Sequence, residues 1–183
     1  MNIKKSIFTL IIIFFNSFYT FSQNINFSSP VDSIVIKGIS STEIDKEISL
    51  IKFKTKPKLQ INKRFLDEDL KLLYSTGYFS SVGAESISSN NLHILEFNLI
   101  ENDLISSLSI DVQSKDITKI LKKEFKSFLN KPINTVLINK RKNKVENLLL
   151  KKGYSFFSFS TIKFNKETQN LSIKASEGII EKI

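Results

Sequence analysis

The sequence contains the same helix ending twice. The first copy reads Leu72-Leu73-Tyr74-Ser75-Thr76-Gly77-Tyr78 and the second reads Leu148-Leu149-Leu150-Lys151-Lys152-Gly153-Tyr154, so the two glycines are 153 − 77 = 76 residues apart. In each copy two leucines close an apolar helix stripe, a glycine can adopt the left-handed conformation past the helix end, and an aromatic residue opens the next strand. A repeat of this length is a small domain rather than a solenoid turn. We therefore expect one folded module to occur twice.

The elements predicted around these segments have the same order in both copies. The first copy is expected to hold a strand over 31–38, a helix capped by Ser41 or Thr42, a helix capped by Asn62, and strands over 80–89 and 92–100 joined at Asn90-Asn91. The second is expected to hold a strand over 104–112, helices over 116–129 and 134–152, and strands over 157–164 and 171–175. We predict an α+β fold of two tandem βααββ modules, each a three-stranded mixed sheet covered on one face by two helices.

The start of the chain is typical of a secretory signal peptide. Lys4 and Lys5 supply a charged start, and the apolar run over 7–15 is shorter than the roughly 20 residues that span a bilayer, which disfavours a membrane anchor. We expect cleavage after Ser22 and export, with a bacterial periplasm favoured over the intermembrane space of a plastid. The predicted domains are a signal peptide over 1–22, a disordered leader over 23–30, modules over 31–103 and 104–178, and the start of a possible third domain over 179–183.

Catalytic residues are hard to find in this sequence. The chain has no cysteine, which removes disulfides, thiolate metal sites and nucleophilic thiols. His93 is its one histidine, and we expect it to face the surface of a strand rather than to serve an active site. Asp67-Glu68-Asp69 could suggest a metal, but carboxylates early in a helix favour its dipole and solvent. We therefore predict no catalytic residue, no metal and no cofactor.

Charge is divided unevenly between the two modules. Residues 24–103 hold 9 basic and 11 acidic groups, whereas residues 104–183 hold 16 basic and 7 acidic groups. The cations of the second module recur at helical spacing on its two predicted helices, where they form either a solvated face or a patch for anionic lipid head groups or an acidic partner. The candidate anionic-surface patch comprises Lys119, Lys122, Lys123, Lys126, Lys140, Arg141, Lys142 and Lys144.

A three-stranded sheet with helices on one face leaves the other face and its borders uncovered. For this order of elements we expect the last strand of each module at the centre and the first strand of the hairpin at a border, which is an unpaired ladder. Phe156, Phe157, Phe159 and Phe164 crowd the border strand of the second module. Because side chains alternate along a strand, they cannot all face one side, and those turned outward would line a groove that accepts an extended peptide.

The pattern resembles the polypeptide-transport-associated (POTRA) domain, a soluble repeat found ahead of the barrel in outer-membrane assembly and translocation proteins. In the first copy the resemblance rests on Val31-x-x-Ile34-x-Ile36-x-Gly38 and on the run from Leu72 to Val82. In the second copy it rests on Gly153-Tyr154 and on Glu177-Gly178-Ile179-Ile180-x-x-Ile183. The second copy departs from the family pattern, because it has no glycine near Val112 and has Ser155 where the first copy has Phe79.

The resemblance implies a binding function at the outer membrane. POTRA domains hold unfolded outer-membrane or translocating polypeptides and dock partner subunits by strand addition, and the barrel would lie either in the same chain or in a separate subunit. The polypeptide-binding edge implied here comprises Ser81, Val82, Ala84, Ser86 and Ser88 in the first module and Phe157, Phe159, Thr161 and Lys163 in the second.

Two other functional classes compete with this interpretation. An exported module for nucleic acid or an anionic membrane surface would use the basic half, although the sequence has no Gly-x-x-Gly loop and no paired aromatic sheet motif. A salt-dependent gel shift would support nucleic-acid binding. An enzyme of the cell envelope would need a pocket with perturbed titrating groups, which this residue inventory scarcely provides.

Overall fold

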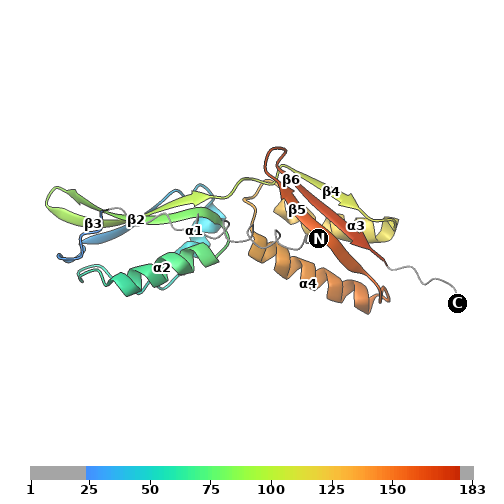
Figure 1. Ribbon diagram of the computed structural model, residues 1–183, viewed down its shortest axis with the longest axis horizontal. Helices are drawn as coiled ribbons and strands as arrows, with labels where there is room; N and C mark the ends of the chain where they lie inside the picture. Colours follow the sequence, from blue (N-terminus) through green and yellow to red (C-terminus); the bar gives the residue numbers. More distant parts are fainter. Residues whose placement is uncertain (1–23, 178–183) are drawn as a thin grey trace, which may run out of the picture. The chain divides into compact units, whose positions relative to one another are not determined.

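The computed structural model describes residues 24–177, which divide into two compact units (Figure 1). One unit comprises the described residues up to Tyr74 together with Ser80–Ile100, and the other comprises Ser75–Phe79 together with those from Glu101 onward. The signal peptide predicted over 1–22 and the third-domain start predicted over 179–183 lie outside the described residues. No helix within residues 24–177 is long and apolar enough to cross a membrane.

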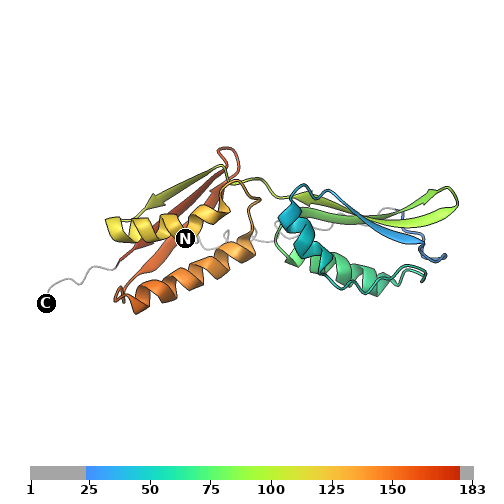
Figure 2. The same ribbon diagram turned by 180° about the vertical axis from the view of Figure 1, so that it is seen from behind.

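The predicted fold class is confirmed. The first module contains β1 (Ser33–Lys37), α1 (Thr42–Ser49), α2 (Lys63–Ser75), β2 (Phe79–Ser89) and β3 (Leu92–Glu101). The second contains β4 (Ser107–Asp111), α3 (Lys115–Phe125), the 3-10 turn η1 (Lys126–Phe128), α4 (Thr135–Lys151), β5 (Ser158–Asn165) and β6 (Asn170–Ser176). In each unit two helices lie on one face of the sheet, as the reverse view also shows (Figure 2).

The strand order is the one predicted from the order of elements. It is β1-β3-β2 in the first sheet and β4-β6-β5 in the second, so β2 and β5 stand at borders. β1 pairs with β3 in parallel and β4 pairs with β6 in parallel, whereas β5 and β6 are antiparallel. Asn90 and Asn91 have φ of 50° and 62°, the left-handed pair that a two-residue hairpin turn requires.

Side-chain caps set the starts of the helices. Ser41, Ser114 and Asn134 each accept a hydrogen bond from the main-chain N–H three residues ahead, which satisfies one of the free donors of the first turn. Asn62 Oδ1 does the same for the N–H of Phe65 at 3.2 Å. Of these four caps, the sequence predicts Asn62 and, as one of two candidates with Thr42, Ser41.

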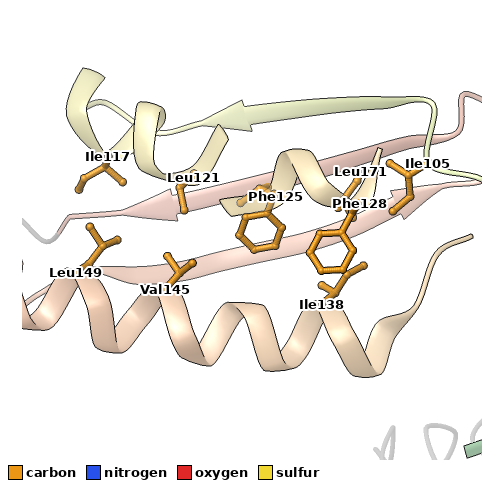
Figure 3. Close-up of a cluster of buried hydrophobic side chains, with 10 residues drawn as sticks. Ile105, Ile117, Leu121, Phe125, Phe128, Ile138, Val145, Leu149 and Leu171 are labelled. Atoms are coloured by element: carbon orange, nitrogen blue, oxygen red, sulfur yellow. The ribbon is translucent and has the colours of Figure 1, made fainter. Parts of the chain in front are cut away.

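Each sheet and its helices enclose an apolar core. In the second module Ile138, Val145 and Leu149 of α4 point toward α3 and η1, with Ile138 facing Phe128 and Leu149 facing Ile117 (Figure 3). In the first module Leu95 and Phe97 of β3 are completely buried, and the ring of Phe53 stacks on that of Phe97 at 5.4 Å. Full burial of such a side chain stabilises the fold by about 1.5–3 kcal/mol.

Two boundaries in the second module differ from prediction. The strand expected from residue 104 begins at Ser107, because the residues before it pair with the loop after η1: Ile105 N–H donates to Lys131 O, and Asn130 N–H donates to Ile105 O. Leu104 is left in an isolated bridge with Pro132. The helix expected over 116–129 narrows to a 3-10 turn after Phe125.

Candidate functional site

β2 offers the longest border strand of either sheet. It has 11 residues and β5 has 8, whereas the opposite borders β1 and β4 have 5 each. The N–H of Ser86 donates to Asn24 O, at 3.3 Å, and so points away from β3. Because main-chain groups alternate sides along an antiparallel strand, Ala84 and Ser88 direct theirs to the same outer side. Three of the five predicted edge residues on β2 are thereby brought together as one row of main-chain groups.

The other two predicted residues on β2 lie nearer the start of the strand. Ser81 and Val82 are both half-buried, and they precede Gly83, where the carbonyl of Asn98 approaches to within 3.9 Å of an ideal Cβ position. Ala84 is 3% exposed, so its side chain belongs to the core and its contribution to the border is the main chain. Ser88 is exposed near the end of the strand that leads into the Asn90-Asn91 turn.

The segment expected to be a disordered leader makes hydrogen bonds to this border. Asn26 N–H donates to Ser86 Oγ at 3.0 Å, next to the bond from Ser86 N–H to Asn24 O. Further along, Ser28 O accepts from Gln60 Nε2 at 3.1 Å. Sequence reasoning missed these contacts, because residues 24–30 have no periodic pattern and their partners are distant along the chain.

His93 is buried, which corrects the prediction that it faces the surface. Its side chain is 8% exposed, in phase with the buried Leu95 and Phe97 two and four residues later. Nδ1 lies 3.0 Å from Pro30 O, and Nε2 lies 3.0 Å from Ser86 Oγ. Because a carbonyl oxygen only accepts, Nδ1 carries the proton in this arrangement, and Nε2 can accept from the serine hydroxyl. His93 thus joins the leader to β2.

The phenylalanines at the border of the second module turn mostly inward. Phe159 stacks edge-on against Phe125 at 6.1 Å and against Phe157 at 5.0 Å, and Phe164 also packs on the core. The outward groove considered in the sequence is therefore not built from these rings, and Phe156 is the member that is exposed, at 62%. What Phe157 and Phe159 contribute near this border is main chain.

The rest of the predicted β5 edge belongs to a polar sheet face. Thr161 lies opposite Lys174, and Lys163 lies opposite Ser172, on the face that the helices leave open. The pairing shifts between Phe159 and Thr161, a bulge that leaves one extra residue on the border strand. Bulges at a border interrupt the regular ladder that a new strand needs, so β5 is a less regular acceptor than the outer side of β2 around Ser86.

The cations of the predicted anionic-surface patch fall into two groups. Arg141 donates to the carbonyl and carboxylate of Glu124 and lies over the Phe128 ring, while Lys144 reaches the same carboxylate at 3.2 Å. Lys119 pairs with Asp116 and Lys142 with Glu146, at 3.4 and 3.8 Å. These four cations are compensated by acids of the same module, and Arg141 links α3 to α4.

The second group faces solvent. Lys122, Lys123, Lys126 and Lys140 are exposed, and none forms an ion pair with another residue of the described chain. Lys122 and Lys126 stand on the side of α3 and η1 opposite the core residues Ile117 and Leu121, as the 3.6-residue period requires. Of the eight predicted patch residues, these four are therefore exposed and not ion-paired within residues 24–177, and the other four are paired.

Two of the three consecutive acids of α2 have separate structural roles, and the third, Asp67, is exposed. Asp69 is 1% exposed, and its two carboxylate oxygens accept from the N–H groups of Lys54 and Thr55, each at 2.8 Å. The prediction that it faces solvent is wrong, because the connector before α2 folds back over this helix. Glu68 binds Lys54 and Arg64, and their hydrogen bonds hold its pKa below the usual value. Among residues 24–177 no cluster of three or more potential ligands could hold a metal ion.

Comparisons with known proteins identify the fold. No protein-family profile matches the sequence, and no curated protein does. The chain is similar to POTRA1-2 of the periplasmic domain of Omp85 from Anabaena, with a TM-score of 0.55 and 16% identity over 83% of this chain and 97% of that one. It is also similar to the N-terminal domain of Omp85 from the thermophilic cyanobacterium Thermosynechococcus elongatus, with a TM-score of 0.63 and 15% identity over 84% of this chain and 64% of that one.

A third similar structure is POTRA1-3 of the Anabaena protein, with a TM-score of 0.56 and 15% identity over 82% of this chain and 62% of that one. The chain thus spans less than two thirds of the two longer structures and nearly all of the two-domain one. The likeness is one of fold: the two βααββ modules are two successive POTRA folds.

Proposed function

We propose that this chain is a non-catalytic periplasmic module of outer-membrane protein assembly or protein translocation. In this proposal it binds extended polypeptide segments by adding them as strands to the borders of its sheets. Its partners are unfolded outer-membrane or translocating polypeptides, and an outer-membrane barrel in the same chain or in a separate subunit. The similarity to periplasmic domains of Omp85 supports the setting, and the geometry of β2 supports the binding mode.

One observation carries the proposal: main-chain groups of β2 point away from its sheet. On that outer side the N–H of Ser86 donates a main-chain hydrogen bond to the carbonyl of Asn24, a residue outside the sheet. Strand addition uses this kind of bond, which is independent of the partner's sequence, and the side chains of the added strand supply mild selectivity. Such a border can bind different polypeptides that share an extended conformation, without requiring a common sequence motif.

Site-specific crosslinking tests where a client binds. A photoreactive residue is placed at Ser88, exposed on the β2 border, or at Lys122, exposed on the outer surface of α3. The probe is a labelled peptide of about ten residues that alternates apolar and polar side chains, as in a membrane-spanning β-strand. We expect crosslinks from Ser88 and none from Lys122. Crosslinks from Lys122 alone would mean that the helix layer, and not the sheet border, receives the peptide.

A second candidate function is binding to an anionic membrane surface. The observation that favours it is the group Lys122, Lys123, Lys126 and Lys140, which are exposed and not paired within the described chain. Each cation near a charged membrane is worth about 1 kcal/mol, so four of them suffice for weak, salt-sensitive association. The two candidates use different surfaces of the modules and are compatible.

A further inference from the structure

We propose that residues 24–29 are an internal occupant of the β2 border, and that a polypeptide client binds there by displacing them. The inference rests on the proposed function, because it concerns the regulation of the same border. It starts from the hydrogen bonds of a segment that the sequence predicts to be without structure.

The leader contacts Ser86 as a neighbouring parallel strand would. In a parallel pair, one residue donates its N–H to a carbonyl of the partner strand, and its own carbonyl accepts from the N–H two residues further along that partner. Here Ser86 N–H donates to Asn24 O at 3.3 Å, and Asn26 N–H donates to Ser86 Oγ at 3.0 Å. The serine hydroxyl takes the place of the main-chain carbonyl, so the outer side of β2 at Ser86 is already in use.

A small polar network holds the leader in this position. Asn26 folds the segment locally: its Oδ1 accepts from Ser28 N–H, and its Nδ2 donates to Ser29 Oγ, both at 2.9 Å. The buried imidazole of His93 then lies between the two sides, 3.2 Å from Ser29 Oγ and 3.0 Å from Ser86 Oγ. The leader is therefore attached to the border by defined contacts at both ends of residues 26–29.

The same contacts are weak enough to be replaced. Asn24, Asn26, Phe27 and Ser28 are all exposed, so little apolar surface holds the segment down. A net hydrogen bond contributes about 1 kcal/mol, and exposed segments with few buried contacts open first. Within residues 24–177 no hydrogen bond joins the leader to Ala84 or Ser88. A client strand that pairs with Ala84, Ser86 and Ser88 forms more main-chain hydrogen bonds to β2 than the leader does.

This arrangement makes the leader a competitor that sets client affinity. The border is available in the fraction of molecules whose leader is detached, and the apparent dissociation constant rises in inverse proportion to that fraction. A client must therefore be extended and long enough to pair on both sides of Ser86. Short or folded segments form too few hydrogen bonds with β2 to displace the leader.

The experiment compares peptide affinity in two variants of the full chain. Asn26→Pro removes the N–H that reaches Ser86 Oγ and disturbs the local fold of the leader, at a position outside every helix and strand. Ser28→Ala is the matched control, since its hydroxyl takes no part in the bonds from the leader to the border. The probe is the labelled alternating peptide, and hydrogen exchange of the Ser86 amide reports the leader without any ligand.

We expect Asn26→Pro to bind the peptide about five-fold more tightly, the equivalent of one net hydrogen bond, and its Ser86 amide to exchange faster. Ser28→Ala should match the wild type in both readouts. Equal affinities of wild type and Asn26→Pro for a peptide that does bind would overturn the competition and leave the proposed function standing. Absence of peptide binding in all three proteins would overturn the proposed function, and this inference with it.

Discussion

Three glycines share a left-handed backbone but differ in the space around them. Gly38, Gly77 and Gly153 have φ of 89°, 81° and 93°, and each would be strained by a side chain. An added Cβ would lie 1.8 Å from the Leu99 carbonyl oxygen at Gly38 and 2.6 Å from Asn134 Oδ1 at Gly77, whereas at Gly153 nothing lies within 4 Å. Gly153 therefore serves as a control, because a side chain there would meet the backbone strain without any steric clash.

The loss of stability caused by an alanine substitution at each glycine should therefore increase with the steric clash of the added Cβ. Gly153→Ala carries the left-handed penalty alone, about 1–2 kcal/mol. Gly77→Ala should cost about 1 kcal/mol more, because Asn134 must abandon the helix cap it forms with Leu137 N–H. Gly38→Ala should be the most destabilising, since main chain cannot move aside. Thermal unfolding of the three variants checks the order, and equal losses would show that the crowding has no energetic effect.

Asp69 should contribute more to the stability of the fold than Asp67, which is on the same helix. Asp69→Ala leaves the half-buried N–H of Lys54 and the buried N–H of Thr55 without their acceptor, which predicts a loss of about 2–4 kcal/mol. Asp67 is exposed on the same helix, and Asp67→Ala should change stability by less than about 0.5 kcal/mol. Urea unfolding of both variants measures the difference, and similar losses would contradict the role given to Asp69.

At the scale of elements, carboxylates tie the connector between α1 and α2 to the rest of the first unit. The pKa of Asp32 is lowered chiefly by a hydrogen bond from Lys58 Nζ, at 2.9 Å, and then by the His93 N–H. That of Glu68 is lowered chiefly by Lys54 and then by Arg64. A carboxyl group whose pKa is lower in the folded state stabilises the fold above its unfolded pKa.

This stabilisation should disappear as the pH falls. Protonating Asp32 and Glu68 removes their bonds to the connector, so the unfolding midpoint of the protein should drop between about pH 5 and pH 2. The double variant Asp32→Asn/Glu68→Gln should show a shallower decline over that range. Denaturant unfolding at a series of pH values gives both slopes, and parallel slopes would argue against these two groups.

The elements themselves could be predicted because their signals are local. Asn90-Asn91 predicts the hairpin turn, and Asn62 predicts the start of α2 that the structure places at Lys63. The expectation that His93 faces solvent is wrong, because its side chain lies on the same side of β3 as the buried Leu95 and is itself buried. Its acceptor Pro30 lies 63 residues away along the chain, and no local pattern reports such a partner.

The proposed binding border, too, could be predicted only in part from the sequence. The order of strands placed β2 and β5 at the borders, since a βααββ module leaves few alternatives. The inward turn of Phe159 and the engagement of Ser86 by Asn24 depend on register and on contacts distant in sequence. Pattern and propensity specify which strand is a border, and tertiary contacts determine which of its groups remain available.

At the scale of the whole molecule, one fold carries two different surfaces. The open face of the second sheet is polar, with Ser109 and Asn170 hydrogen-bonded across it and Lys174 paired with Asp111. The open face of the first sheet instead includes Val35. Its partner on β3 is the buried Glu96, which forms an ion pair with Lys37. The 9 to 11 ratio of basic to acidic groups in residues 24–103 and the 16 to 7 ratio in 104–183 place the cationic character in the second module.

This asymmetry predicts salt-dependent membrane association through the second module. Replacing Lys122, Lys123, Lys126 and Lys140 by glutamine should abolish sedimentation with vesicles that contain anionic lipid, and binding by the wild type should weaken between low and physiological salt. The matched control replaces Lys46, Lys52, Lys56 and Lys63 of the first module, which are exposed and change the net charge equally. Equal losses in both variants would indicate a general charge effect, and a gel shift with nucleic acid would favour that ligand instead.

The most direct test concerns the main chain of the β2 border. Ser88→Pro removes an outward N–H, whereas Ser88→Ala removes the hydroxyl and keeps that N–H. If clients bind by strand addition, the proline variant should lose affinity for the alternating peptide by about five-fold or more, and the alanine variant should bind like the wild type. Equal binding by Ser88→Pro and Ser88→Ala would contradict capture of polypeptides at this border.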